Sequence, residues 1–398
     1  MRTTIVILLF LPSLLLCGCC GGAEKNVLVS YDVDPAWKVV KHLQADYEVA
    51  YVKDNNVCVS DVNCSHLKIV GYSSYWNCLL DWSSDGETLF LQRERGCIDG
   101  ILVERCKDTL APFPVPSEDV ESCMLESLLH PSVAIERLFP MPGAKCLWYL
   151  LNFRSGESLV REVRKINLTE LRDPAIGGSP ILPRDNSNGK VFRVDVNFAQ
   201  QIMVVWREKM LEVYDLEGRL IRILGEYNGA ADFMTTADGE NILYTSSVFM
   251  ENTKQWVHMI TRRDLETGQE ARLFWGEHPV PAPQGANFGY AREGAIWIAM
   301  LMAGRLVNFG YGPVLRMNVS EAGQEWINTV ENISWSSDGR LLIVNLTAER
   351  ETDRGSRPEQ KLALNRVEKT AILDLKRREI LIIDGELKHP AFRPRMTE

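Results

Sequence analysis

The chain has 398 residues, of which 45% are hydrophobic and 24% are charged, a globular composition that excludes a disordered, collagen-like or polytopic membrane chain. The 44 Lys and Arg residues are outnumbered by 53 Asp and Glu residues, which gives a net charge of -9. This balance argues against nucleic acid as a partner, because phosphate contacts require cationic side chains.

The N-terminus predicts export. Arg2 precedes a mostly apolar run from Ile5 to Leu16, which has the length of a secretory signal and is too short to span a bilayer. The run ends in Leu16-Cys17-Gly18-Cys19, which resembles the bacterial lipobox, whose last cysteine is acylated after cleavage. We therefore expect lipidation at Cys19 and a location in the cell envelope, anchored to the membrane by lipid on its periplasmic or outer face. An ordinary signal peptide cut nearby is the alternative.

The remaining cysteines fit an oxidising compartment, where thiols can pair. Short loops favour two local disulfides, Cys58 with Cys64 and Cys97 with Cys106, and the connectivity of the others stays open. Buried free thiols are the alternative. The only C-x-x-C spacing runs from Cys17 to Cys20 and would be split by signal cleavage, which disfavours a thioredoxin-type site and a zinc ribbon.

A repeat runs along the chain. The segments Asp81–Leu91 and Ser334–Val344 nearly copy each other, and Thr235–Tyr244 keeps the same Asp-Gly pair and the strand-like run after it. Because Asp-Gly between strand-like runs is typical of a tight hairpin, each copy predicts a strand, a type I′ turn and a second strand.

A second feature recurs once in each unit, where Asp or Asn separates two strand-like runs. It occurs at Asp61, Asp108, Asn167, Asp215, Asp264, Asn318 and Asp374, at intervals of 47 to 59 residues. Seven units with two turns each predict an all-β chain folded as a β-propeller of seven four-stranded blades. A β-sandwich is the alternative. Asn26 to Tyr31 is a candidate strand to complete the last blade.

The expected organisation is therefore a lipoprotein signal peptide over residues 1–18, a tether over 19–29 and the propeller over 30–398. The W-S-S-D-G segments at Trp82 and Trp335 resemble WD40-like β-propeller repeats of the PD40 type, which occur in TolB-type periplasmic proteins and in propeller domains of prolyl-oligopeptidase relatives. The resemblance implies the fold over most of residues 30–390. It transfers no activity, because propellers carry many functions on one scaffold.

Searches for catalytic motifs assign no catalytic, cofactor-binding or metal-binding residue. The chain has no G-x-S-x-G nucleophile elbow, and its six histidines include no H-E-x-x-H pattern. The turn from Asp264 to Gly268 resembles the D-x-x-T-G turn of quinoprotein propellers, but Arg272 holds the place of the docking Trp, so we interpret it as structural. Stacking of a sugar on tryptophan is a weaker hypothesis, with Trp76, Trp82, Trp275 and Trp335 as candidates because they lie near turns or strand ends.

Two functional hypotheses follow. The first is an envelope-anchored, non-catalytic propeller that acts as a scaffold for an unidentified envelope protein, which binds through loops. The second is a small-ligand or carbohydrate binder, or an enzyme, with a site in the central channel assembled from residues of different blades. Carboxylates or histidines that converge at one mouth of the channel would favour the second.

Overall fold

The computed structural model describes residues 3–6, 27–72, 79–94, 97–103, 122–124, 134–141, 146–155, 158–167, 179–182, 191–227, 233–302, 305–308, 312–321, 324–350 and 366–394. Cys19 and Cys106 lie outside these residues. The described residues form β-strands, turns and bends and contain no α-helix. The predicted all-β class is therefore confirmed.

The strands group into seven sheets, which we number in the order they follow around the ring. Sheet 1 contains β32 (Lys388–Phe392), β4 (Glu48–Lys53), β5 (Asn56–Asp61) and β6 (Leu67–Tyr72). Sheet 2 contains β7 (Leu80–Trp82), β8 (Thr88–Glu94), β9 (Cys97–Leu102) and β10 (Ser122–Met124). Sheet 3 contains β11 (Ala134–Pro140), β12 (Cys146–Ser155), β13 (Ser158–Asn167) and β14 (Ser179–Pro180).

Sheet 4 contains β15 (Val191–Asn197), β16 (Ile202–Arg207), β17 (Met210–Asp215) and β18 (Leu220–Glu226). Sheet 5 contains β19 (Phe233–Thr235), β20 (Asn241–Met250), β21 (Gln255–Asp264) and β22 (Glu270–Trp275). Sheet 6 contains β23 (Glu277–Pro281), β24 (Asn287–Arg292), β25 (Ala295–Met302), β26 (Arg305–Asn308), β27 (Leu315–Ser320), β2 (Leu28–Val33) and β1 (Thr3–Val6). Sheet 7 contains β28 (Trp326–Trp335), β29 (Leu341–Arg350), β30 (Arg366–Asp374), β31 (Glu379–Asp384) and β3 (Lys38–Val40).

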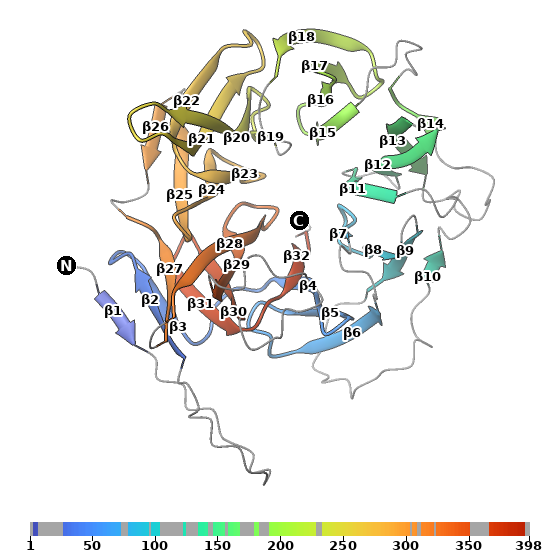
Figure 1. Cartoon of the computed structure of the whole chain (residues 1–398). Helices are drawn as coiled ribbons and strands as arrows, with labels where there is room; N and C mark the ends of the chain where they lie inside the picture. Colours follow the sequence, from blue (N-terminus) through green and yellow to red (C-terminus); the bar gives the residue numbers. More distant parts are fainter. Residues whose placement is uncertain are drawn as a thin grey trace.

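The sheets stand around a central axis, and the last strand, β32, lies near the middle of the ring (Figure 1). This arrangement is a β-propeller, as the repeat predicted. Sheet 6 departs from the regular four-strand path, because β25 pairs with β24, β26 and β27, and β27 in turn pairs with β2. The other six sheets each contain an uninterrupted run of four antiparallel strands.

The core lies between neighbouring sheets. Both faces of a blade are covered by the next blades, so its middle strands are nearly continuous apolar runs rather than alternating ones. In β29, all eight residues from Leu341 to Ala348 are buried. One hydrophobic cluster joins sheets 6 and 7 and contains Ile296, Met317, Leu342 and Val344.

The Asp-Gly copies lie between the two innermost strands of sheets 2, 5 and 7. In sheet 7, Ser336 Oγ donates to Asp338 Oδ1 at 2.6 Å, Arg340 N donates to the same oxygen at 3.2 Å, and Leu341 N donates to Ser336 Oγ at 2.9 Å. The other two copies form the same bonds around Ser83 with Asp85 and Thr236 with Asp238. The hydroxyl and the carboxylate are thus needed to pair the backbone N–H groups of the turn.

The predicted type I′ geometry is wrong in these turns. A type I′ turn needs positive φ at both central residues, but only the glycine of each pair has it, with φ of 69° at Gly86, 70° at Gly239 and 68° at Gly339. Each turn instead closes with a bond from the glycine N–H to the carbonyl three residues earlier, at 2.8 to 2.9 Å. In each turn the aspartate carboxylate accepts from the backbone N–H two residues later.

The second repeated feature marks the turn before the outermost strand. Asp374 ends β30, and its Oδ1 accepts from Lys376 N at 3.0 Å and Arg377 N at 3.1 Å. Asp61, Asp215 and Asp264 bond their turns in the same way. Asn318 breaks the prediction, because it lies inside β27 and pairs with Ser30. Asp108 lies outside the described residues.

Strands from the first and last parts of the chain close the ring. The C-terminal strand β32 pairs with β4 as the inner strand of sheet 1. Strand β3, which follows β1 and β2 in the chain, adds to β31 in parallel at the outer edge of sheet 7. The suggestion that Asn26 to Tyr31 completes the last blade is therefore wrong, because β2 pairs with β27 in sheet 6. β1 lies in the segment predicted as the signal peptide and pairs with β2.

Candidate functional site

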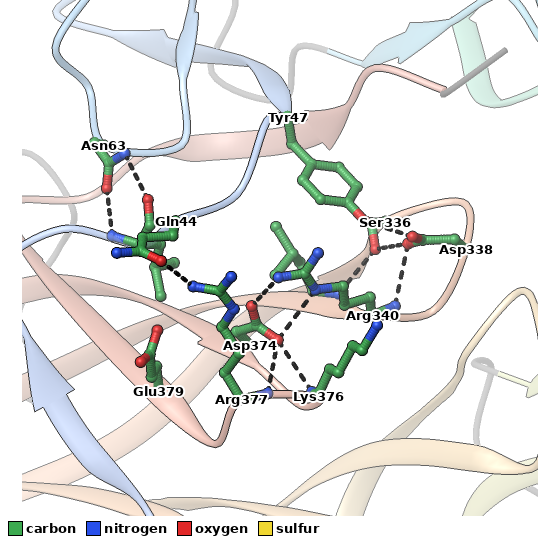
Figure 2. A network of polar contacts seen from close by, with 12 residues as sticks. Gln44, Tyr47, Asn63, Ser336, Asp338, Arg340, Asp374, Lys376, Arg377 and Glu379 are labelled. Carbon is green, nitrogen blue, oxygen red and sulfur yellow. Dashed lines mark hydrogen bonds and ion pairs between the residues drawn. The ribbon is translucent and has the colours of Figure 1, made fainter.

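A polar network crosses the seam where sheet 7 meets sheet 1 (Figure 2). The Tyr47 hydroxyl, from the segment before β4, donates to Asp338 in the Asp-Gly turn of sheet 7. Tyr47 is 3% exposed and packs edge-on against Phe392 of β32, with ring centroids 6.1 Å apart. The Tyr47 side chain therefore connects the Asp-Gly turn of sheet 7 to β32 of sheet 1, and its backbone leads directly into β4.

Asp374 is the centre of the network in sheet 7. Its carboxylate accepts a forked pair of bonds from the Arg340 guanidinium, with Nε at 3.2 Å from Oδ1, in addition to the two turn N–H groups. The Asp374 side chain is fully buried. A forked arginine bond supplies both charge compensation and orientation. The fork thereby fixes the Asp-Gly turn of sheet 7 to the turn before β31.

The same turns reach the N-terminal segment. Arg377 Nη1 donates to Gln44 Oε1 at 2.6 Å, and the Asn63 side chain bonds both backbone polar groups of Leu43, at 2.7 and 3.1 Å. Lys38 pairs with Glu379 at 2.8 Å. Segment 38–48 is thus held from both sides, by sheet 7 and by the turn after β5.

A cavity of about 470 Å³ opens beside this segment. Its lining consists of Gln44, Ala45, Asp46, Tyr47, Glu48, Asp61, Asn63 and His66. The volume lies within the range of small-ligand pockets and of clefts that accept one large side chain. Three of the eight residues carry carboxylates and none is Lys or Arg. Because Arg393 pairs with Glu48, Asp46 and Asp61 give the lining its negative charge, which favours a positively charged group.

The lining is held in place by contacts that also serve the fold. Glu48 pairs with Arg393, and Asp61 Oδ1 accepts two turn N–H groups. His66 Nε2 lies 4.0 Å from Asp61 Oδ2, and the His66 side chain is 48% exposed. The described residues contain no cluster of His, Cys, Asp and Glu able to hold a metal ion. The arrangement provides a preformed acidic recess that can bind a cation by charge and hydrogen bonds.

The predicted disulfide between Cys58 and Cys64 is not formed, and both residues are free thiols. Each sulfur has another neighbour: Cys58 Sγ donates to Asn56 O at 3.7 Å, and the Tyr51 hydroxyl donates to Cys64 Sγ at 4.0 Å. Tyr51 also pairs directly with Cys58 across β4 and β5. For the second predicted pair, Cys97 lies in β9 and Cys106 lies outside the described residues.

Cys58 is expected to be a slow nucleophile. Burial raises the pKa of its thiol to about 11, from 9.0, and the thiolate is the reactive form. At pH 8 we expect alkylation of native Cys58 at least roughly 100-fold slower than that of an unperturbed thiol. Mass spectrometry of iodoacetamide-treated protein, with and without urea, measures this rate. Rapid labelling of Cys58 in the folded protein would contradict the buried position.

The inner strands of four neighbouring sheets carry a second polar group. Arg137 of β11 pairs with Asp195 of β15 at 2.9 Å and donates to Val194 O at 3.3 Å. Asp195 Oδ2 accepts from the Thr235 backbone N at 2.8 Å and from its hydroxyl at 2.7 Å. The positive charge of Arg137 also acts on Asp81 of β7. Arg137 thus interacts with one aspartate from each of two neighbouring sheets.

No linear motif could have indicated this convergence, although a weaker signal exists. Asp81 lies two residues before Ser83, and Asp195 lies two residues before Asn197. Ser83 and Asn197 each begin the turn between the two inner strands of their sheet, so the two aspartates occupy equivalent places in two units. Arg137 has no such place in the repeat. The pairing of Arg137 with Asp195 depends on the neighbouring sheet, which the sequence does not reveal.

Asp81 is expected to oppose folding at neutral pH. Desolvation raises its pKa to about 6, against the lowering effects of the Trp82 N–H and Arg137. A carboxyl whose pKa is raised on folding stabilises the protein below its unfolded pKa, and this contribution is lost as the pH rises through 6. Asp81→Asn should therefore raise the free energy of unfolding by about 2 kcal/mol at pH 7 and change it little at pH 3.5. Urea unfolding at both pH values measures the difference, and an equal effect at both would contradict the assignment.

The tryptophan candidates divide by exposure. Trp82 and Trp335 are buried, at 2% and 8% exposed, and their indole N–H groups donate to backbone carbonyls of neighbouring sheets, so the stacking hypothesis is wrong for both. Trp275 is 48% exposed, and Trp76 lies outside the described residues. Trp256, which the sequence did not single out, is the most exposed at 68%.

Comparison with solved structures finds distant similarity to three chains. TolB from Acinetobacter baumannii is 13% identical, with a TM-score of 0.38 over 88% of this chain and 67% of that chain. Kuenenia stuttgartiensis hydrazine synthase is 11% identical, with a TM-score of 0.32 over 77% and 65%. The dihydro-heme d1 dehydrogenase NirN in complex with DHE is 12% identical, with a TM-score of 0.44 over 88% and 76%.

The arrangement of the described sheets defines a β-propeller, and the chain has distant structural similarity to TolB. No family model and no curated protein matches the chain. At these identities the likeness concerns the fold alone. In the described part of the chain, no helix has the length and apolar character needed to cross a membrane.

Proposed function

We propose that the protein is an envelope-anchored, non-catalytic lipoprotein whose propeller acts as a scaffold for a protein partner. In this proposal the ring has seven four-stranded blades, with sheet 6 as the irregular blade, and the lipid is attached at Cys19. The lipobox-like segment supports the anchor, and the seven sheets support the blade count. The partner is an envelope protein that docks at the seam between sheets 7 and 1.

One observation carries the docking proposal, which is the acidic cavity at that seam. Its volume of about 470 Å³ and the carboxylates of Asp46 and Asp61 fit a lysine or arginine side chain projecting from a partner. The walls are fixed by the network around Tyr47 and Asp374, so little ordering is needed on binding. A rigid recess of one charge gives both affinity and orientation to a partner of opposite charge.

A second candidate function is favoured by the convergence of Asp81, Arg137 and Asp195. These groups come from the inner strands of three sheets, which is the arrangement expected for a small ligand in the central channel. Asp195 is already paired with Arg137 and Thr235, and Asp81 Oδ1 accepts from Trp82 N at 2.8 Å. We rank this candidate below the scaffold because both carboxylates already accept hydrogen bonds within the protein.

A crosslinking pull-down tests the proposal with paired charge reversals. The exported protein is crosslinked briefly, solubilised in mild detergent and captured as wild type, Asp46→Lys and Glu217→Lys. Asp46 lines the cavity, whereas Glu217 lies in an exposed turn of sheet 4 with a 69% exposed side chain. We expect one stoichiometric envelope partner that is lost with Asp46→Lys and kept with Glu217→Lys.

Cys19→Ser is the control for the anchor. It should move the protein out of the membrane fraction and weaken capture of the same partner. Equal capture by Asp46→Lys and wild type would place the partner elsewhere on the propeller. Absence of any partner with all four proteins would overturn the scaffold proposal and favour the channel ligand.

A further inference from the structure

The hairpin of β20 and β21 extends beyond the rest of sheet 5. The two strands pair with each other over ten residues each, from Asn241 to Met250 and from Gln255 to Asp264. β19 pairs only with residues 242–244 of the hairpin, and β22 only with residues 259–263. The far half of the hairpin therefore stands free of its own sheet's outer and inner strands.

Two exposed aromatic rings face each other on this free half. Phe249 and Trp256 are directly opposed in the register, with ring centroids 5.4 Å apart and planes inclined at 57°. They are 43% and 68% exposed. Large exposed aromatic side chains on a rigid sheet are a common feature of binding surfaces, because they bury much apolar area at little entropic cost.

The next pair on the same face carries hydrogen-bonding groups. Ser247 and His258 are directly opposed one step closer to the ring, and Ser247 Oγ lies 3.3 Å from His258 Nδ1. Residues two apart on a strand share a face, so these groups adjoin Phe249 and Trp256. Both Ser247 and His258 are exposed. The His258 backbone carbonyl accepts from Gly276 N at 3.0 Å, which ties this part of the hairpin to the chain entering sheet 6.

We propose that this face, formed by Ser247, Phe249, Trp256 and His258, binds carbohydrate. A pyranose ring presents an apolar C–H face and a rim of hydroxyl groups, so it needs an aromatic surface with hydrogen-bonding groups at its edge. The indole face of Trp256 supplies the first. The Ser247 hydroxyl and the His258 imidazole supply donors and acceptors for the second. This site lies on a different sheet from the acidic cavity and does not depend on the proposed partner.

The hairpin tip argues against a lipid bilayer as the occupant. The turn from Glu251 to Lys254 lies beyond the aromatic pair and carries two charged and two polar side chains. A bilayer would have to accept these groups before the rings reached its apolar region, which is unfavourable for unpaired charges. A free glycan chain has no such requirement, because it can approach the hairpin from the side.

Binding of defined oligosaccharides tests the proposal. The probes are cellohexaose, chitohexaose and maltohexaose, which differ in linkage and in the N-acetyl group, and binding is followed by calorimetry and tryptophan fluorescence at low millimolar sugar. The variants are Trp256→Ala, His258→Ala and Trp275→Ala. Trp275 is the matched control, because it is also exposed but lies opposite Met259, on the other face of the hairpin.

At least one oligosaccharide should bind the wild type. Trp256→Ala should weaken that binding by about tenfold, as expected for loss of one stacking ring. His258→Ala should weaken it several-fold, and Trp275→Ala should leave it unchanged. All three residues are exposed, so thermal melting should show that each variant is folded.

Three results would overturn the proposal. The first is no binding of any of the three sugars, and the second is equal weakening by Trp256→Ala and Trp275→Ala. In the third, the wild type binds no sugar but binds phosphatidylglycerol vesicles or the crosslinked protein partner, and Trp256→Ala loses that binding. That last result would assign the aromatic face to a membrane or to a protein, and it is distinguishable from failure of the cavity proposal because Asp46→Lys leaves this face intact.

Discussion

Replacing Arg393 with alanine is expected to lower the free energy of unfolding by about 3 kcal/mol. The Arg393 guanidinium joins sheets 1 and 2 just after β32: it pairs with Glu48, donates to Gly86 O at 2.6 Å and donates to Val103 O at 2.9 Å. It also lies over the ring of Trp82, with its central carbon 4.9 Å from the centroid. Its removal leaves a part-buried carboxylate and two carbonyls without these partners, which is why the expected loss is large.

The matched control is Arg219→Ala. Arg219 also makes a close ion pair, at 2.6 Å from Asp215, but its side chain is 77% exposed and its pair lies within one turn. Exposed ion pairs contribute little in water, so we expect the free energy of unfolding to stay nearly unchanged. Urea denaturation of the two variants beside the wild type makes the comparison. Equal losses would show that the Arg393 contacts do not hold the ring closed.

Asp374→Ala is expected to cost about 4 kcal/mol, the larger of the two effects. The fully buried carboxylate accepts from Arg340, Lys376 N and Arg377 N. Its loss removes all these bonds and leaves the Arg340 guanidinium, which is mostly buried, without its carboxylate. We also expect the network across the seam to loosen, because Arg340 and Asp338 belong to the same turn.

Asp264→Ala distinguishes the contribution of the turn hydrogen bonds to stability from that of the arginine–aspartate ion pair. Asp264 holds the equivalent turn of sheet 5 through backbone bonds from Glu266 and Thr267, and the Thr267 N–H is the main cause of its lowered pKa. This variant should lose less stability than Asp374→Ala, because no arginine fork is broken. If Asp264→Ala is the more damaging variant, the Arg340 fork contributes nothing. A double variant with Arg340→Ala measures the coupling directly.

The repeat could be predicted from the sequence because its bonds are local. Ser336, Asp338 and Leu341 lie within six residues, so their hydrogen bonds recur wherever those residue types recur. Asp61 and Asp374 mark their turns for the same reason. The turn type could not be read from Asp-Gly alone, since the upstream hydroxyl changes which backbone conformation is favoured.

Contacts between distant residues left no such pattern. Arg393 and Glu48 are 345 residues apart, and the Trp82 indole donates to Ala391 O across 309 residues. The sequence therefore indicated a ring without showing which strand closes it. Exposure was equally hidden: Trp82 and Trp335 are buried and bonded to neighbouring sheets, whereas Trp256 is exposed on the part of the hairpin that extends beyond β19 and β22.

The pairing of β32 with β4 has a consequence for biogenesis. Sheet 1 combines β4, β5 and β6 with β32, the last strand of the described chain. During synthesis the inner edge of β4 therefore stays unpaired until β32 has been made. Contacts of such long range slow folding and prolong exposure of strand edges. The intermediate with sheets 2 to 7 formed and sheet 1 open is thus the species most exposed to aggregation and proteolysis. A chain that crosses a membrane unfolded would reach this state on the far side, where it would need protection until its last strand is delivered.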